Sequence, residues 1–208
     1  MKIRLLFLTF FCSICLSLSA QVDAFQENII EYLNINGTEN QYNDAYDEMF
    51  DVLKQQFLDV PDKEWNELKV GKNESVQDVI KFLAFAYRKH FTESDIVEMT
   101  NFYKTETAQK LVAGSNDLTN TDNDKIMEFF QSDLGKKIES KREPLSVDIA
   151  EISSTWSREL FAEKMSTLIN ACNFFKQPSF STCKITGSSS KKRSLSLTLP
   201  SLTKSRTN

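Results

Sequence analysis

The sequence predicts an all-α protein, a compact antiparallel bundle of about seven or eight helices with a disordered C-terminal tail. Three observations lead to this prediction. Apolar residues recur every three or four positions, the helical period, and no two-residue alternation competes with it over the N-terminal half. The 208 residues include only 5 Gly and 4 Pro, too few turn residues for a sandwich or barrel of many short strands. A content of 40% hydrophobic and 26% charged residues is that of a globular domain.

The N-terminal segment is typical of a secretory signal peptide. Lys2 and Arg4 precede sixteen mostly apolar residues, Leu5–Ala20, which are fewer than the roughly 20 needed to cross a membrane and which end in small residues. We therefore expect residues 1–20 to be removed by cleavage between Ala20 and Gln21. Cleavage after Ser19 and an uncleaved membrane anchor are the alternatives. Export to the periplasm or the extracellular space follows, with no transmembrane helix left after cleavage.

Residues 21–172 form the predicted helical domain, and its charge limits the partners it can bind. Between residues 21 and 183 there are 17 basic and 29 acidic residues, a net charge of −12. Such an acidic body repels nucleic acid and anionic lipid. Nucleic acid is therefore not an expected partner.

The first predicted helices are separated by glycine and proline. Gly37 ends a helix, Pro61 opens a short one and Gly71 closes it. Ser75-x-x-Asp78 resembles a capping box and is expected to begin the next helix. The apolar stripes of these four helices are Val22, Phe25, Ile29 and Leu33; Tyr42, Tyr46, Met49, Leu53 and Phe57; Trp65 and Leu68; and Val76, Ile80, Leu83 and Tyr87.

The second half of the domain continues in the same way. Thr92-x-x-Asp95 begins a helix, and Gly114 stops the segment that follows it. Ser115–Asp124 reads as a polar turn. A final helix of roughly 25 residues is expected after Pro144. The apolar stripes here are Ile96, Met99 and Tyr103; Ile126, Phe130, Leu134 and Ile138; and Ile149, Ile152, Trp156, Leu160 and Leu168.

Two segments of this half repeat one another at an offset of 27 residues: NFYKTETAQKLV (Asn101–Val112) and EFFQSDLGKKIE (Glu128–Glu139). The matching positions include an aromatic pair, a hydroxyl residue, a small residue and a lysine. They are Phe102, Tyr103, Thr105, Ala108 and Lys110 in the first copy, and Phe129, Phe130, Ser132, Gly135 and Lys137 in the second.

Each repeated position has a structural interpretation. The aromatic pair fills a core layer, the hydroxyl caps a new helical turn, the small residue lets another helix approach, and the lysine projects into solvent. We therefore predict a helix break or kink at Thr105 and at Ser132. If Phe102 and Phe129 are core residues, replacing either by Ala costs about 3–5 kcal/mol.

This pattern resembles a secreted bacterial family, domain of unknown function 2059. The family combines a segment like AYRKHFTESDIVEMTNFY, here Ala86–Tyr103, with a helix of the pattern FY-x-[ST]-x-x-G-x-K. The resemblance is good over residues 75–141 and looser over residues 25–170, and Ala108 stands where the family usually has Gly. It implies an all-helical protein that follows a signal peptide and has no established activity.

The sequence offers few candidates for chemistry. The single His, His90, is interpreted as a cation at a helix C-terminus beside Arg88 and Lys89, with a general base as the alternative. Asp117, Asp122 and Asp124 are interpreted as a solvated turn rather than a calcium loop, because the Gly and Glu of an EF-hand are missing. No motif of a hydrolase, zinc protease or phosphate-binding loop occurs. We therefore assign no catalytic, cofactor-binding or metal-binding residue.

The C-terminal part, residues 173–208, is rich in Ser and Lys and is predicted to be disordered. An anchoring peptide for an anionic surface, using Lys191, Lys192 and Arg193, is the alternative. After export Cys172 and Cys183 are the remaining thiols. They form either a disulfide, worth up to about 3 kcal/mol, or two free thiols.

These observations favour an exported, non-enzymatic helical domain that binds a protein or surface component of the bacterial envelope. Its many Phe residues also allow a carrier of an apolar small molecule between helices. A carboxylate-based hydrolase is a further alternative, because so many acidic residues permit accidental pairs.

Overall fold

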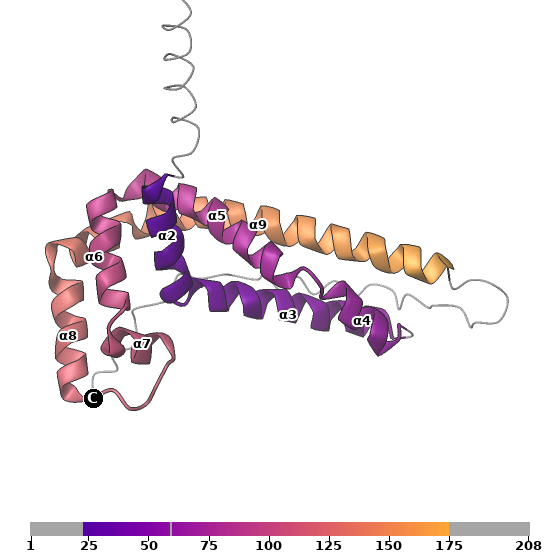
Figure 1. The fold of residues 1–208 in the computed structure, drawn as a ribbon, viewed down its shortest axis with the longest axis horizontal. Helices are drawn as coiled ribbons and strands as arrows, with labels where there is room; N and C mark the ends of the chain where they lie inside the picture. Colours follow the sequence, from indigo (N-terminus) through magenta and orange to yellow (C-terminus); the bar gives the residue numbers. More distant parts are fainter. Residues whose placement is uncertain (1–22, 59, 175–208) are drawn as a thin grey trace, which may run out of the picture.

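The computed structural model describes residues 23–58 and 60–174, with side chains as far as residue 170 (Figure 1). The predicted cleavage site between Ala20 and Gln21, the pairing of Cys172 with Cys183, and the tail beyond residue 174 lie outside the described side chains. Throughout the described residues the secondary structure is helical, without strands, so the all-α prediction is confirmed. The helices are α2 (Ala24–Ile35), α3 (Thr38–Gln56), α4 (Asp62–Leu68), α5 (Lys72–His90), α6 (Glu93–Tyr103), α7 (Glu106–Val112), α8 (Asn120–Gln131) and α9 (Asp133–Phe174).

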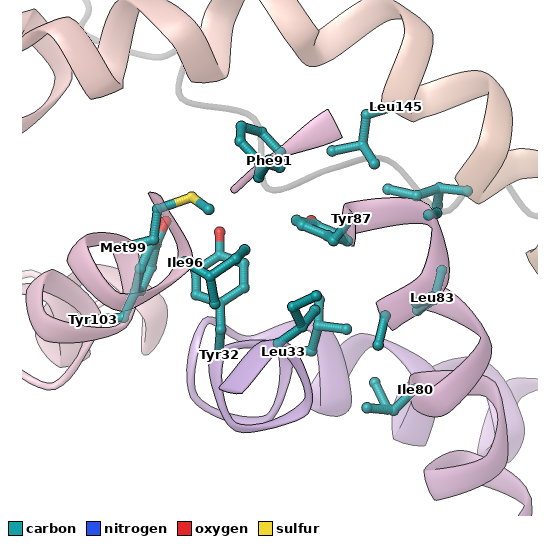
Figure 2. Close-up of a cluster of buried hydrophobic side chains, with 14 of the residues drawn as sticks. Tyr32, Leu33, Ile80, Leu83, Tyr87, Phe91, Ile96, Met99, Tyr103 and Leu145 are labelled. Atoms are coloured by element: carbon teal, nitrogen blue, oxygen red, sulfur yellow. The ribbon is translucent and has the colours of Figure 1, made fainter. Parts of the chain in front are cut away.

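The main core forms where α2 packs between α5 and α6 (Figures 1 and 2). Tyr32 of α2 lies edge-on to Tyr87 of α5 and to Tyr103 of α6, with ring centroids 5.6 Å apart in both pairs. Edge-on aromatic pairs add to the free energy gained from burying their area. Figure 2 shows Leu145 of α9 closing the same cluster from the other side of α5.

A second apolar cluster fills the arm that extends to one side of this core in Figure 1. It joins the apolar stripe of α3 to α4 and to the C-terminal half of α9. Its buried members are Tyr46, Met49, Phe50, Leu53, Phe57, Trp65, Leu68, Leu160 and Leu168. Trp156 packs against both clusters, and its indole Nε1–H donates to the carbonyl oxygen of Ser75 at 3.2 Å. Among the described helices, none has the length and apolar character to cross a membrane.

The start of α5 differs from the prediction. The helix begins at Lys72, with Gly71 as its N-cap in the left-handed region (φ +88°), and not at a Ser75–Asp78 capping box. Glycine takes this backbone conformation without strain, so the helix begins four residues, about one turn, earlier. Ser75, now in the first turn, accepts the hydrogen bonds of Trp156 instead.

The last helix also differs, because α9 runs for 42 residues and contains Pro144. Proline has no N–H to donate to the carbonyl of Ser140, which usually weakens or kinks a helix. Here Pro144 is exposed, so that carbonyl is on the solvent side. Leu134, Leu145 and Ile149 are buried on both sides of the proline, and their packing keeps the helix continuous.

Replacing Pro144 by Ala is expected to stabilise the protein by about 1–3 kcal/mol, since the restored amide donates to Ser140 and Ala is the better helix former. Urea unfolding followed by circular dichroism measures the change. Glu143→Ala, at the exposed neighbouring position, is the matched control and should stay within about 0.5 kcal/mol of the wild type. A destabilised Pro144→Ala variant would contradict this account of α9.

Candidate functional site

The two predicted helix breaks are present, and the same side-chain contacts make both. Thr105 Oγ1 accepts from the amide of Ala108 at 3.2 Å and donates to the carbonyl of Phe102 at 2.7 Å. Ser132 Oγ accepts from the amide of Gly135 at 3.1 Å and donates to the carbonyl of Phe129 at 2.7 Å. Each hydroxyl therefore ends one helix and caps the next. The predictions at Thr105 and Ser132 are confirmed.

The small residue that follows each break has a different role in the two segments. Ala108 is fully buried in the main core, where its methyl group is accommodated. At Gly135 a Cβ atom would lie 2.3 Å from the carbonyl oxygen of Phe130, a backbone atom. The helix break at Ser132 therefore has no room for a side chain at position 135, whereas the break at Thr105 accommodates the alanine at position 108.

The lysine of each segment pairs with an aspartate that lies upstream of the other segment. Lys137 Nζ lies 2.5 Å from Asp95 Oδ2, and Lys110 Nζ lies 3.6 Å from Asp122 Oδ2. Both aspartates belong to capping boxes, Asp95 with Thr92 at the start of α6 and Asp122 with Thr119 at the start of α8. The expectation that these lysines project freely into solvent is wrong, because each is paired and only about a third exposed.

These contacts control the ionisation of the two aspartates. Burial opposes ionisation of Asp95, but the bonds from Lys137 and Thr92 outweigh it and lower the pKa of its carboxyl. Thr107 Oγ1 donates to Asp122 Oδ1 at 2.6 Å, and this bond, with those from Thr119, holds the pKa of Asp122 well below its usual range.

Asp122 is buried in the first turn of α8, so the expectation of a solvated turn through residue 124 is wrong at this position. Its carboxylate is occupied by bonds that fix the N-terminus of the helix. In the part of the chain that the structure describes, no three acidic, His or Cys side chains are grouped so as to hold a metal ion.

The repeated aromatic residues pack mainly against one another. The rings of Phe102 and Phe129 are parallel, with centroids 3.8 Å apart, and Phe130 lies edge-on to both. Of the four, Tyr103 is buried in the core, Phe102 and Phe129 are half-buried and pack against it, and Phe130 is half-buried. The prediction of a filled core layer therefore holds for Tyr103 and in part for Phe102 and Phe129, which contact the core without being enclosed by it.

His90 ends α5 in a basic last turn, as predicted, and has a partner that the sequence did not indicate. Its Nε2 lies 2.6 Å from Asp148 Oδ2 of α9, and Lys89 Nζ lies 3.0 Å from the other oxygen of the same carboxylate. These bonds, chiefly the one to His90, lower the pKa of Asp148. The cluster ties the C-terminal end of α5 to α9.

The outer side of α5 carries two exposed aromatic residues. Phe82 and Phe85 are each 61% exposed, and residues three apart are neighbours on a helix surface. Between residues 79 and 92 the chain has Lys81, Arg88 and Lys89 but no acidic residue. We call the exposed side chains of this segment, Phe82, Phe85, Lys81, Arg88 and Lys89, the α5 aromatic face. Sequence reasoning missed it by assigning most Phe residues to the core.

One missed feature was present in the sequence. Thr119 and Asp122 follow Thr92 and Asp95 at the same offset of 27 residues as the repeated segments. Extending the comparison upstream would have identified the second capping box and thus the buried Asp122. By contrast, the pairing of His90 with Asp148 joins residues 58 positions apart and has no local signal.

The fold and these contacts define a class: a small all-α protein whose later helices are divided by hydroxyl-capped breaks. Residues 77–127, about a quarter of the chain, match the model of a family described as "Uncharacterized protein conserved in bacteria (DUF2059)". This match confirms the resemblance predicted from the sequence. It includes the first repeated segment and the beginning of α8. No curated protein and no solved structure matches the chain.

Asp122→Asn is expected to lower the free energy of unfolding at neutral pH. It should also make this free energy fall less steeply as the pH is lowered. Because the pKa of Asp122 is depressed in the folded state, its contribution is complete above the unfolded pKa of about 4 and is lost as the pH falls through the folded value. Urea unfolding at a series of pH values measures both effects. Asp124→Asn, exposed on the same helix, serves as the control. An acid dependence as steep as that of the wild type would refute the role of Asp122.

Phe102→Ala and Phe129→Ala are each expected to cost about 1–3 kcal/mol, less than the full-burial value, because both rings are half-buried. The double variant should lose less than the sum, by about 0.5–1.5 kcal/mol, since the two rings stack on each other. Urea unfolding of the four proteins gives this coupling energy. Phe102→Ala combined with Phe57→Ala, in the other cluster, is the additive control, and additivity in the stacked pair would contradict the prediction.

Proposed function

We propose that this protein is an exported, non-enzymatic helical module that binds a protein or surface component of the bacterial envelope. The α5 aromatic face is the observation that carries the proposal. Two neighbouring Phe rings in water forgo the free energy of burial, about 25 cal/mol for each Å² of apolar surface. An exposed apolar patch bordered by charged side chains is typical of a site that a partner covers.

Packing of the aromatic residues favours this function over a carrier of apolar molecules. The rings of Tyr32, Tyr87 and Tyr103 contact one another in the main core, and Tyr46 stacks on Phe50 in the arm at 5.0 Å. These rings are used to hold helices together. The aromatic surface left for a ligand is on the outside, which suits a macromolecular partner better than an enclosed small molecule.

Electrostatics likewise favours binding over carboxylate-based hydrolysis. A general acid or base works best with a pKa near the working pH. The contacts of Asp95, Asp122 and Asp148 instead lower their pKa values. Each carboxylate is held by Lys, Thr or His partners that join helices, so its contacts are those of a structural residue.

Export and binding can be tested together in the native host. The mature protein is expected in the periplasmic or secreted fraction with a mass that corresponds to loss of residues 1–20. A photo-crosslinking amino acid at Phe85 should give a defined product with an envelope component, whereas one at Asn66, an exposed polar position on α4, should not. A cytosolic protein with an intact N-terminus, or equal products from both positions, would contradict the proposal.

A further inference from the structure

We propose that the partner of the α5 aromatic face is the lipid bilayer itself, with Phe82 and Phe85 entering the interfacial region of the membrane on which the exported protein resides. This inference rests on the proposed export. It narrows the proposed partner from any protein or surface component of the envelope to one surface, the interfacial region of a phospholipid membrane.

The composition of the face fits this boundary. Phe82 and Phe85 provide apolar rings, and Lys81, Arg88 and Lys89 are exposed beside them on the same helix. Aromatic rings and long cationic side chains partition together at membrane interfaces, where the rings enter the acyl boundary and the charges contact phosphate groups. Each cation also pairs with a carboxylate, of Asp78, Asp23 or Asp148, which anchors it at the edge of the face.

The position of the face in the fold also points to the membrane. Arg88 pairs with Asp23 and lies 4.8 Å from the ring centroid of Phe25, and Gln26 donates to the carbonyl oxygen of Lys81 at 3.1 Å. The start of α2 is therefore held beside the C-terminal half of α5, as Figure 1 shows. These contacts place the first described residue next to the aromatic face.

That placement limits how far the face can be from a membrane during export. Asp23 follows the apolar segment Leu5–Ala20 by only three residues, which span at most about 10 Å. In a chain that keeps residues 1–20 in the bilayer, this span holds the start of α2 within about 10 Å of the membrane, and after cleavage the contact depends on the face alone. The α5 aromatic face is on the side where α2 begins, whereas Leu58 and Val70, also exposed and apolar, lie near α4 in the arm.

The acidic charge of the whole body does not prevent this contact. Charges separated by more than about 8 Å are largely screened at physiological ionic strength, so the membrane responds mainly to the nearest residues. The three cations of the face each pair with a carboxylate, of Asp78, Asp23 or Asp148, so the face is close to neutral and its two Phe rings provide the main attraction to the membrane. The unpaired acidic charge of the rest of the body disfavours contact through its other surfaces.

Flotation with vesicles of phosphatidylethanolamine and phosphatidylglycerol tests the inference on the exported chain purified from its host. We expect wild-type protein to float with the vesicles, and Phe82→Ser/Phe85→Ser to lose at least about tenfold in apparent affinity. Leu58→Ser/Val70→Ser is the matched control for exposed apolar residues and should bind like the wild type. A triple variant, Lys191→Gln/Lys192→Gln/Arg193→Gln, measures any separate contribution of the tail. Circular dichroism verifies that each variant is folded.

A second measurement applies whether or not residues 1–20 have been removed. Tryptophan at position 85, introduced as Phe85→Trp, should be quenched by brominated lipids, whereas tryptophan introduced as Val70→Trp should not. Absence of vesicle binding by the exported wild type, unchanged binding of the double Phe variant, or equal quenching at both positions would overturn the inference. If Phe85 crosslinks to an envelope protein and the vesicles are not bound, the membrane inference fails while the proposed interaction function stands.

Discussion

The packing of α5 is the constraint on which the other parts of the structure depend. Helices α2, α3 and α9 all contact it, and Val76, Val79, Ile80 and Leu83 from its inner side are buried in the main core. This inner side fixes the direction of α5, and the outer side consequently presents Phe82 and Phe85 to solvent. Stability and the proposed binding surface therefore arise from opposite sides of one amphipathic helix.

The crossed lysines give the second half of the domain its internal order. Lys137 reaches back to the capping box of α6, and Lys110 reaches forward to that of α8. Each lysine thus joins the helix after one break to a capping box, and the rings of Phe102 and Phe129 stack on each other. The Asp95 carboxyl is only 16% exposed and also accepts from Thr92, so this pair is less open to water than a fully exposed ion pair, which contributes little.

The sequence allowed prediction of features that depend on neighbouring residues. Helical periodicity located the stripes, and the hydroxyls of Thr105 and Ser132 located the breaks, because caps act within one turn. Features that depend on tertiary packing were not predictable from local pattern. The continuity of α9 through Pro144, the pairing of His90 with Asp148, and the exposure of two Phe residues are set by which helix faces meet.

The uninterrupted length of α9 has a mechanical consequence. At about 1.5 Å per residue its 42 residues form a rod of about 60 Å. One end is clamped into the body through Leu134 and Leu145, and the other holds the arm through Leu160 and Leu168. A displacement of the arm is therefore passed along the backbone of α9 to α5, the helix that bears the aromatic face, because the two helices are in contact and Asp148 pairs with His90.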